Sequence, residues 1–76
     1  MAGEVRPVTI RDASIRLGQL LKLADFIDHG SEARDLLALG VVLVNGEVET
    51  RRGRQLVHGD TVSVGGQTVG IESSGH

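Results

Sequence analysis

Three arginines fall within four residues in the segment Arg51-Arg52-Gly53-Arg54. A guanidinium group binds phosphate oxygens through two parallel hydrogen bonds, and a glycine lets the backbone approach a ligand closely. This residue pattern could therefore bind the phosphates of a nucleic acid. Taken alone, the segment fits an ordinary exposed polar loop slightly better, so both interpretations stay open at this point.

Other candidate phosphate contacts lie on two expected helices. Lys22 points away from the apolar stripe of the first helix and is therefore exposed, although its position alone does not distinguish a phosphate contact from a solubilising charge; Arg16, just ahead of that helix, is a weaker candidate of the same kind. Ser31 suits the N-cap of the second helix, where free amides and the helix dipole favour an anion, and Arg34 lies one turn further on. Ordinary capping explains Ser31 equally well, and a solubilising charge would explain Lys22.

Catalytic chemistry finds little support in these 76 residues, and we expect no enzyme, no metal site and no cofactor. The chain has no cysteine, and its three histidines, His29, His58 and His76, lie far apart without metal-ligand spacing. It contains no nucleophile elbow, no phosphate-binding Gly-Lys-Ser/Thr loop and no dinucleotide fingerprint. Non-covalent binding is the remaining class of function.

The net charge of −2 hides an uneven distribution of charged side chains. Residues 25–49 carry six acidic side chains against Arg34 alone, whereas residues 50–76 carry three arginines against two acidic residues. Cations gathered on one face could bind an anion although the whole chain is acidic, and we expect the acidic segment to face away from them. The absence of cysteine and of any apolar run near 20 residues predicts a cytoplasmic protein without a membrane partner.

Two helices come early in the chain. A short strand is expected at residues 7–10 and a turn at 11–14, followed by a helix in LGQLLKLADFI, at residues 17–27. Its apolar face groups five residues: Leu17, Leu20, Leu21, Ala24 and Ile27. The second helix begins at Ser31 and stops near Gly40. The only aromatic residue, Phe26, is expected to pack against a neighbouring element.

The remainder of the chain is typical of strands and tight turns. Asn45-Gly46 predicts a type I′ hairpin between residues 41–44 and 47–49, because both residues tolerate a positive φ. Further strands are expected at residues 61–64 and 67–71. The predicted fold is α+β, with two short packed helices against a small, bent, mostly antiparallel sheet. We expect a single domain at residues 1–72 and a frayed tail at 73–76.

The order of these motifs resembles a known RNA-binding family. LGQLLKLADFID, SEAR, LVNGEVETRRGRQL and HGDTVSV occur in the order typical of the domain named after small-subunit ribosomal protein four, here called the S-four domain. The closest resemblance is to short stand-alone bacterial members, and it covers roughly residues 15–64. It implies an α-L RNA-binding motif in which the helix pair and the adjoining strand and loop grip folded RNA.

Transferred to this chain, the resemblance implies a set of RNA contacts and a partner. The implied contacts are Lys22, Ser31, Arg34, Arg51, Arg52 and Arg54. With a single aromatic residue for base stacking, the ligand is expected to be structured, ribosomal RNA, recognised through its shape and about 4–6 phosphates. A ribosomal protein is a further possible partner. The alternative function is a protein-interaction module, because VNGE followed by Gly-Asp also resembles ubiquitin-like sulfur carriers, and such a module would bind a basic partner.

Overall fold

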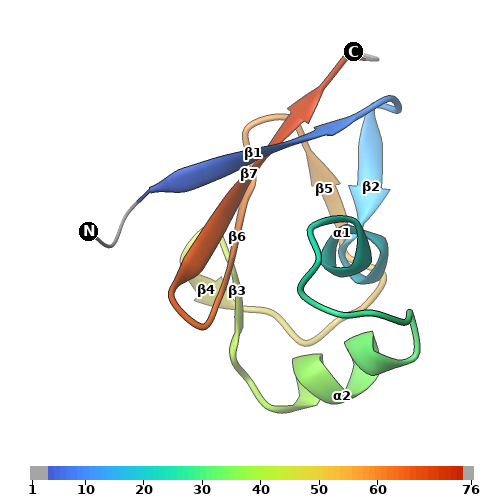
Figure 1. Cartoon of the computed structure of the whole chain (residues 1–76), viewed down its shortest axis with the longest axis vertical. Helices are drawn as coiled ribbons and strands as arrows, with labels where there is room; N and C mark the ends of the chain where they lie inside the picture. The colour runs from blue at the N-terminus through green and yellow to red at the C-terminus, as the bar shows by residue number, and fades with distance from the viewer. Residues whose placement is uncertain (1–3, 75–76) are drawn as a thin grey trace.

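The computed structural model describes residues 4–74, which form two small sheets and two short helices (Figure 1). The helices are α1 (Leu17–Leu23) and α2 (Glu32–Ala38). The strands are β1 (Val5–Ile10), β2 (Ser14–Arg16), β3 (Val42–Val44), β4 (Glu47–Val48), β5 (Gln55–Val57), β6 (Thr61–Val64) and β7 (Gln67–Ser73). Within residues 4–74, neither helix is long enough to cross a membrane.

The strands form a five-stranded sheet in the order β1-β7-β6-β3-β4 and a separate two-stranded sheet of β2 and β5. β1 runs parallel to β7, and every other pair among the described strands is antiparallel. The expected α+β fold with a mostly antiparallel sheet is therefore confirmed. The sequence patterns missed β2 and β5, because residues 11–14 were expected to form a turn and residues 55–57 were left unassigned.

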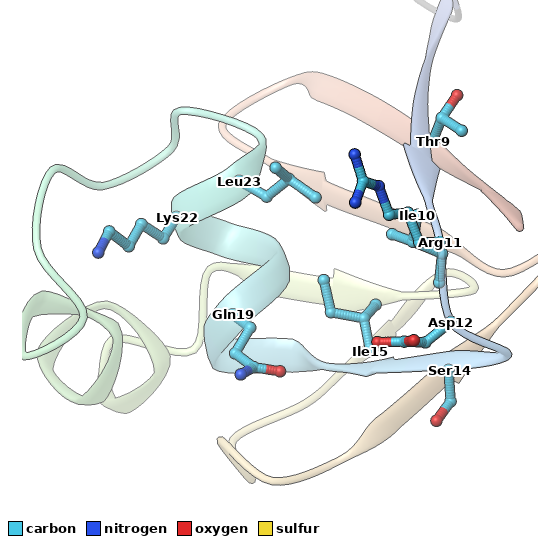
Figure 2. Close-up of a pocket in the computed structure, with 9 residues that line it drawn as sticks. All are labelled: Thr9, Ile10, Arg11, Asp12, Ser14, Ile15, Gln19, Lys22 and Leu23. Carbon is cyan, nitrogen blue, oxygen red and sulfur yellow. The ribbon is translucent and has the colours of Figure 1, made fainter.

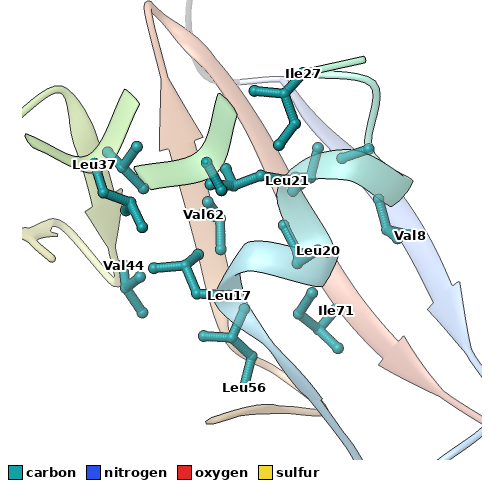
Figure 3. Close-up of a cluster of buried hydrophobic side chains, with 14 of the residues drawn as sticks. Val8, Leu17, Leu20, Leu21, Ile27, Leu37, Val44, Leu56, Val62 and Ile71 are labelled. Carbon is teal, nitrogen blue, oxygen red and sulfur yellow. The ribbon is translucent and has the colours of Figure 1, made fainter. Parts of the chain in front are cut away.

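The core lies between the helices and the sheet (Figure 3). The apolar face predicted for the first helix is confirmed, because all five of its residues are at most 7% exposed. The other elements contribute further buried side chains to this core: Leu37 of α2, Val44 of β3, Val62 of β6 and Leu56 of β5. Phe26 packs against this cluster, as expected. A small core that draws on both helices and both sheets fixes their relative positions.

α1 ends four residues earlier than its apolar periodicity predicted. After Leu23 the chain makes a Schellman turn, in which the Phe26 amide donates to the Leu21 carbonyl at 2.9 Å and the Asp25 amide to the Lys22 carbonyl at 3.1 Å. Asp25 adopts the left-handed conformation, with φ 63°, that usually favours glycine. Ile27 is buried by the turn that follows the helix rather than by the helix itself.

The start of α2 also differs from the expectation. Ser31 stands at the N-cap position, but its backbone is helical and its hydroxyl makes no capping hydrogen bond within the described chain. The Glu32 carboxylate instead accepts a hydrogen bond from the His29 amide at 3.0 Å. The expected end of this helix is confirmed, since Gly40 has a φ of +73°.

The Asn45-Gly46 hairpin is confirmed, with φ values of 53° and 85°. The side chain of Asn45 also connects this hairpin to the turn before β6. Asn45 Nδ2 donates a hydrogen bond to the Asp60 carboxylate at 3.1 Å, and Asn45 Oδ1 accepts one from the backbone amide of Thr61 at 2.9 Å. Asp60 belongs to the turn between β5 and β6. These two contacts hold the hairpin against the start of β6.

The end of β7 lies further along the chain than expected. Ser73 is a buried strand residue whose hydroxyl donates to the Asp12 carbonyl at 2.7 Å, and the Ser74 amide donates to the Ile10 carbonyl at 2.9 Å. The prediction of a frayed tail is therefore wrong at these two residues. The rest of that predicted tail, residues 75–76, lies outside the described residues.

Candidate nucleic-acid interface

The loop between β4 and β5 is bonded to the first turn of α1. The amide of Leu17 donates to the Arg54 carbonyl at 2.8 Å, and the amide of Gly18 donates to the Arg52 carbonyl at 2.9 Å. Free amides at a helix start need acceptors, and here a distant loop supplies two of them in place of a capping side chain. The arginine loop and α1 therefore form one rigid unit.

Gly18 allows the side chain of Arg52 to lie across α1. A β-carbon at Gly18 would stand 2.5 Å from Arg52 Cγ, a distance that real β-carbons do not show, and 3.2 Å from its Cδ, which is also tight. The aliphatic part of Arg52 thus occupies the space that any other residue would fill. This packing sets the direction in which the guanidinium group leaves the loop.

Beside this contact lies a groove of about 480 Å³ between α1 and the loop. Its lining consists of Arg16, Gly18, Gln19, Lys22, Gly30, Arg52 and Gly53. Three of the candidate cations, Arg16, Lys22 and Arg52, therefore converge here without an acidic neighbour in the lining. Among residues 4–74, no ion pair involves any of these three. The groove is a positively charged surface that is free to receive anions.

The other two loop arginines are held by Glu49, which is only 7% exposed. Its carboxylate accepts hydrogen bonds from Arg51 Nε at 3.1 Å, from Arg51 Nη2 at 3.0 Å and from Arg54 Nη1 at 3.0 Å. The amides of Thr50 and Arg51 also donate to it, each at 3.0 Å. The expectation that the acidic segment faces away from the arginines is therefore wrong at Glu49.

These contacts change the electrostatics of the loop. The pKa of the Glu49 carboxyl is held far below its ordinary value, mainly by the hydrogen bonds from the Arg51 side chain. The hydrogen bond from the Arg51 amide lowers it further, and the one from the Arg54 side chain does so next. The same carboxylate raises the pKa of Arg51. Glu49 is thus a carboxylate at all ordinary pH values, and it cancels one of the two positive charges beside it.

Arg51 and Arg54 differ in what remains available to a ligand. The side chain of Arg51 is 74% exposed and bonds Glu49 along one edge, so its outer nitrogen still faces solvent. The side chain of Arg54 is 31% exposed and is directed at the same carboxylate. Sequence reasoning missed the role of Glu49; the available signal was a glutamate two and five residues ahead of these arginines.

Like Arg51 and Arg54, the two remaining predicted contacts lie outside the groove lining. Ser31 and Arg34 are exposed at the start of α2, and of the residues around them only Gly30 contributes to the described groove lining. The structure thus divides the candidates into three groups: three cations in the groove, two arginines held by Glu49, and two exposed residues on α2.

Comparisons with known proteins agree with this architecture. A family model described as S4 domain, the family called S-four above, matches residues 8–72. The chain is 48% identical over 60 residues to the "probable ribosome maturation protein RlbA" of Bacillus subtilis (strain 168), covering 79% of this chain and 84% of that protein. It is 40% identical over 57 residues to the "putative RNA-binding protein YbcJ" of Escherichia coli (strain K12), covering 75% and 81%.

A solved structure shares the fold. The solution structure of YbcJ from E. coli, described as revealing an αL motif involved in RNA binding, superimposes with a TM-score of 0.67 at 32% identity. The match covers 93% of this chain and 91% of YbcJ. The resemblance and the fold inferred from the sequence are confirmed. These relatives give no support to the alternative of a ubiquitin-like protein-binding module.

Proposed function

The chain belongs to the S4 domain family, and on this premise we propose that it is a non-catalytic RNA-binding protein that contacts folded RNA through the groove beside α1. The observation that carries the proposal is the convergence of Arg16, Lys22 and Arg52 with no acidic side chain in the groove lining. Guanidinium and ammonium groups in such a groove pair with phosphates of an RNA backbone. The net charge of −2 does not oppose this binding, because the local field of the groove decides it.

Arg51 is a further phosphate contact through the nitrogen that faces away from Glu49, whereas Arg54 acts mainly by holding the loop in place. Ser31 and Arg34 would reach RNA only at the edge of the interface, beyond Gly30. The number of neutralised phosphates is then about three or four, at or just below the lower end of the range of about 4–6 expected from the sequence.

Ribosomal RNA in the cytoplasm is the ligand that we favour. One relative is named a probable ribosome maturation protein and another a putative RNA-binding protein. Ribosomal RNA offers double-stranded and looped elements whose phosphate positions are fixed by their folding, and recognition through shape suits a chain with a single aromatic residue. The protein would bind such an element while the ribosomal subunit is being completed.

The test compares two variants with the same change in charge. Arg52→Gln removes one positive charge from the groove, and Gln67→Glu adds one negative charge at the β6–β7 turn, which lies away from α1 (Figure 1). Filter binding to refolded bacterial ribosomal RNA should weaken about tenfold for the first variant and by much less for the second. Equal losses would mean that only total charge matters, and the groove would then have no special role.

A further inference from the structure

A second hollow, of about 780 Å³, lies on the other side of α1, between this helix and the bend that joins β1 to β2 (Figure 2). It shares Gln19 and Lys22 with the cationic groove, so the two depressions form one continuous surface across α1. Its size lies within the range of about 300–1,000 Å³ that is typical of small-ligand sites. The sequence patterns did not indicate this hollow.

The lining of the hollow combines apolar side chains with polar and charged ones, among them the cations Arg11 and Lys22. Figure 2 shows Leu23 of α1, Ile15 of β2 and Arg11 of the bend pointing into the same space. Leu23 is 52% exposed, so its side chain is accessible to a ligand in the hollow. Arg11 makes no ion pair within residues 4–74, although Asp12 is its neighbour in sequence. A planar guanidinium opposite the exposed Leu23 and the partly buried Ile15 provides two walls for a flat ring.

The bend that carries Arg11 is held in place by the end of β7. The Ser73 hydroxyl donates to the Asp12 carbonyl at 2.7 Å, and the Ser74 amide donates to the Ile10 carbonyl at 2.9 Å. These hydrogen bonds fix the backbone at Ile10 and Asp12, the residues before and after Arg11. The rim of the hollow is therefore formed before any ligand arrives, which lowers the entropic cost of binding.

We propose that this hollow takes an unpaired nucleobase of the bound RNA, with the base between the Arg11 guanidinium and the side chains of Leu23 and Ile15. The proposal rests on the proposed function, because the phosphate attached to that base would lie at Lys22, where the hollow meets the groove. Unpaired bases in RNA stack on guanidinium planes as well as on aromatic rings. The hollow would thus supply a stacking surface in a chain that has a single aromatic residue.

A base fits the hollow better than a phosphate does. The Asp12 carboxylate contributes to its lining and would repel a phosphate placed inside, whereas it can accept a hydrogen bond from an amino group of a base. Burial of Leu23 and Ile15 by an aromatic ring also removes apolar surface from water, which a phosphate cannot do. The phosphate therefore belongs at the edge, beside Lys22.

Nuclear magnetic resonance of the full chain tests the proposal with two small probes. Cytidine 5′-monophosphate carries both a base and a phosphate, and ribose 5-phosphate carries the same phosphate without the base. In millimolar titrations, the cytidine compound should shift the methyl signals of Leu23 and Ile15 and the Nε–H signal of Arg11, whereas ribose 5-phosphate should leave the two methyl signals in place. Equal methyl shifts with both probes, or none with either, would overturn the proposal.

Variants separate stacking from charge. Arg11→Lys keeps the positive charge but removes the planar guanidinium group. Leu23→Ser removes an apolar side chain that is already half exposed. Each variant should reduce the chemical-shift changes caused by cytidine 5′-monophosphate at least threefold. Leu39→Ser, at a leucine that is 72% exposed outside the hollow, is the matched control and should retain them. Retention of the full shifts by both Arg11→Lys and Leu23→Ser would also overturn the proposal. Failure of the groove hypothesis would appear separately, as unchanged ribosomal RNA binding by Arg52→Gln.

Discussion

The side chain of Arg52 lies against the backbone of Gly18, closely enough that a β-carbon at Gly18 would stand 2.5 Å from Arg52 Cγ. The Gly18 amide also donates to the Arg52 carbonyl at 2.9 Å. The start of α1 and the direction of one candidate RNA contact therefore depend on the same two residues. A change at Gly18 should separate the stability of the helix from the binding of RNA.

Gly18→Ala should make the protein a weaker RNA binder with little change in stability. Alanine is favoured over glycine inside a helix by about 1 kcal/mol, but the new β-carbon would stand 2.5 Å from Arg52 Cγ, close to the backbone of the loop, and the cost of moving this side chain offsets the gain. The displaced guanidinium would leave the groove, and affinity for ribosomal RNA should fall about fivefold, or about 1 kcal/mol. Urea denaturation and filter binding measure the two effects.

A double-mutant cycle provides the control for this prediction. In an Arg52→Ala background the added methyl group has no side chain to displace, so Gly18→Ala should leave the remaining affinity unchanged. If the two substitutions weaken binding additively, Gly18 acts on RNA by some route other than Arg52.

The salt dependence of binding should report the cations in the groove. Each phosphate that is neutralised releases counterions, so the slope of log affinity against log salt concentration should be roughly −3 for three to four contacts. Lys22→Gln and Arg16→Gln should each make the slope shallower by about one, and Gln67→Glu should leave it unchanged. A slope that does not respond to the two groove variants would place the phosphates elsewhere.

Glu49 should make the fold sensitive to acid. Because the native state lowers the pKa of this carboxyl, its contribution to stability is complete above the ordinary value of about 4.5 and is lost as the pH falls below it. The free energy of unfolding of the wild type should therefore decrease between pH 5 and pH 2 more steeply than that of Glu49→Gln. Urea denaturation at several pH values measures this difference.

Glu47→Gln is the matched control for acid sensitivity, since Glu47 is an exposed carboxylate two residues away. Its pH profile should follow that of the wild type. Parallel profiles for the wild type and Glu49→Gln would show that the carboxylate does not stabilise the loop.

Asp25→Gly should stabilise the protein by about 0.5–1 kcal/mol, because Asp25 holds the left-handed position of the Schellman turn with φ 63°. Thermal denaturation measures the change. Asp28→Gly removes the same charge at an exposed residue without a positive φ, and it should be neutral or slightly destabilising. A gain in stability at both positions would indicate that charge rather than backbone conformation is responsible.

Local patterns in the sequence were sufficient to predict much of the fold. The buried face of α1 follows from the spacing of its leucines, and the hairpin follows from Asn45-Gly46, because both signals act within a few residues. The end of α1 could not be predicted in this way. An aspartate in the left-handed conformation carries no clear signal, and the Ala24 carbonyl that ends the helix accepts a hydrogen bond from distant Arg6 Nη2 at 2.6 Å.

The candidate site could be predicted only in part from the sequence, because it too depends on contacts between residues that are far apart along the chain. Arg52 and Lys22 were identified by residue type and by the family resemblance, but their meeting in one groove depends on a loop whose carbonyls bind the start of α1. The two strands that bring this loop to the helix, β2 and β5, have three residues each, too few for a clear alternating pattern. Glu49 was counted with the acidic segment because charge counting does not reveal which carboxylate is buried.

The parallel pairing of β1 with β7 has a consequence for how the chain folds. The register joins Val5 to Thr68 and Ile10 to Ser73, so β1 finds its partner only after the ribosome has synthesised β7. Contacts between such distant segments carry a large loop-closure entropy and slow the search for the native state. The nascent chain should therefore be able to assemble its helices and the Asn45-Gly46 hairpin first, with β1 joining the sheet only once β7 is available.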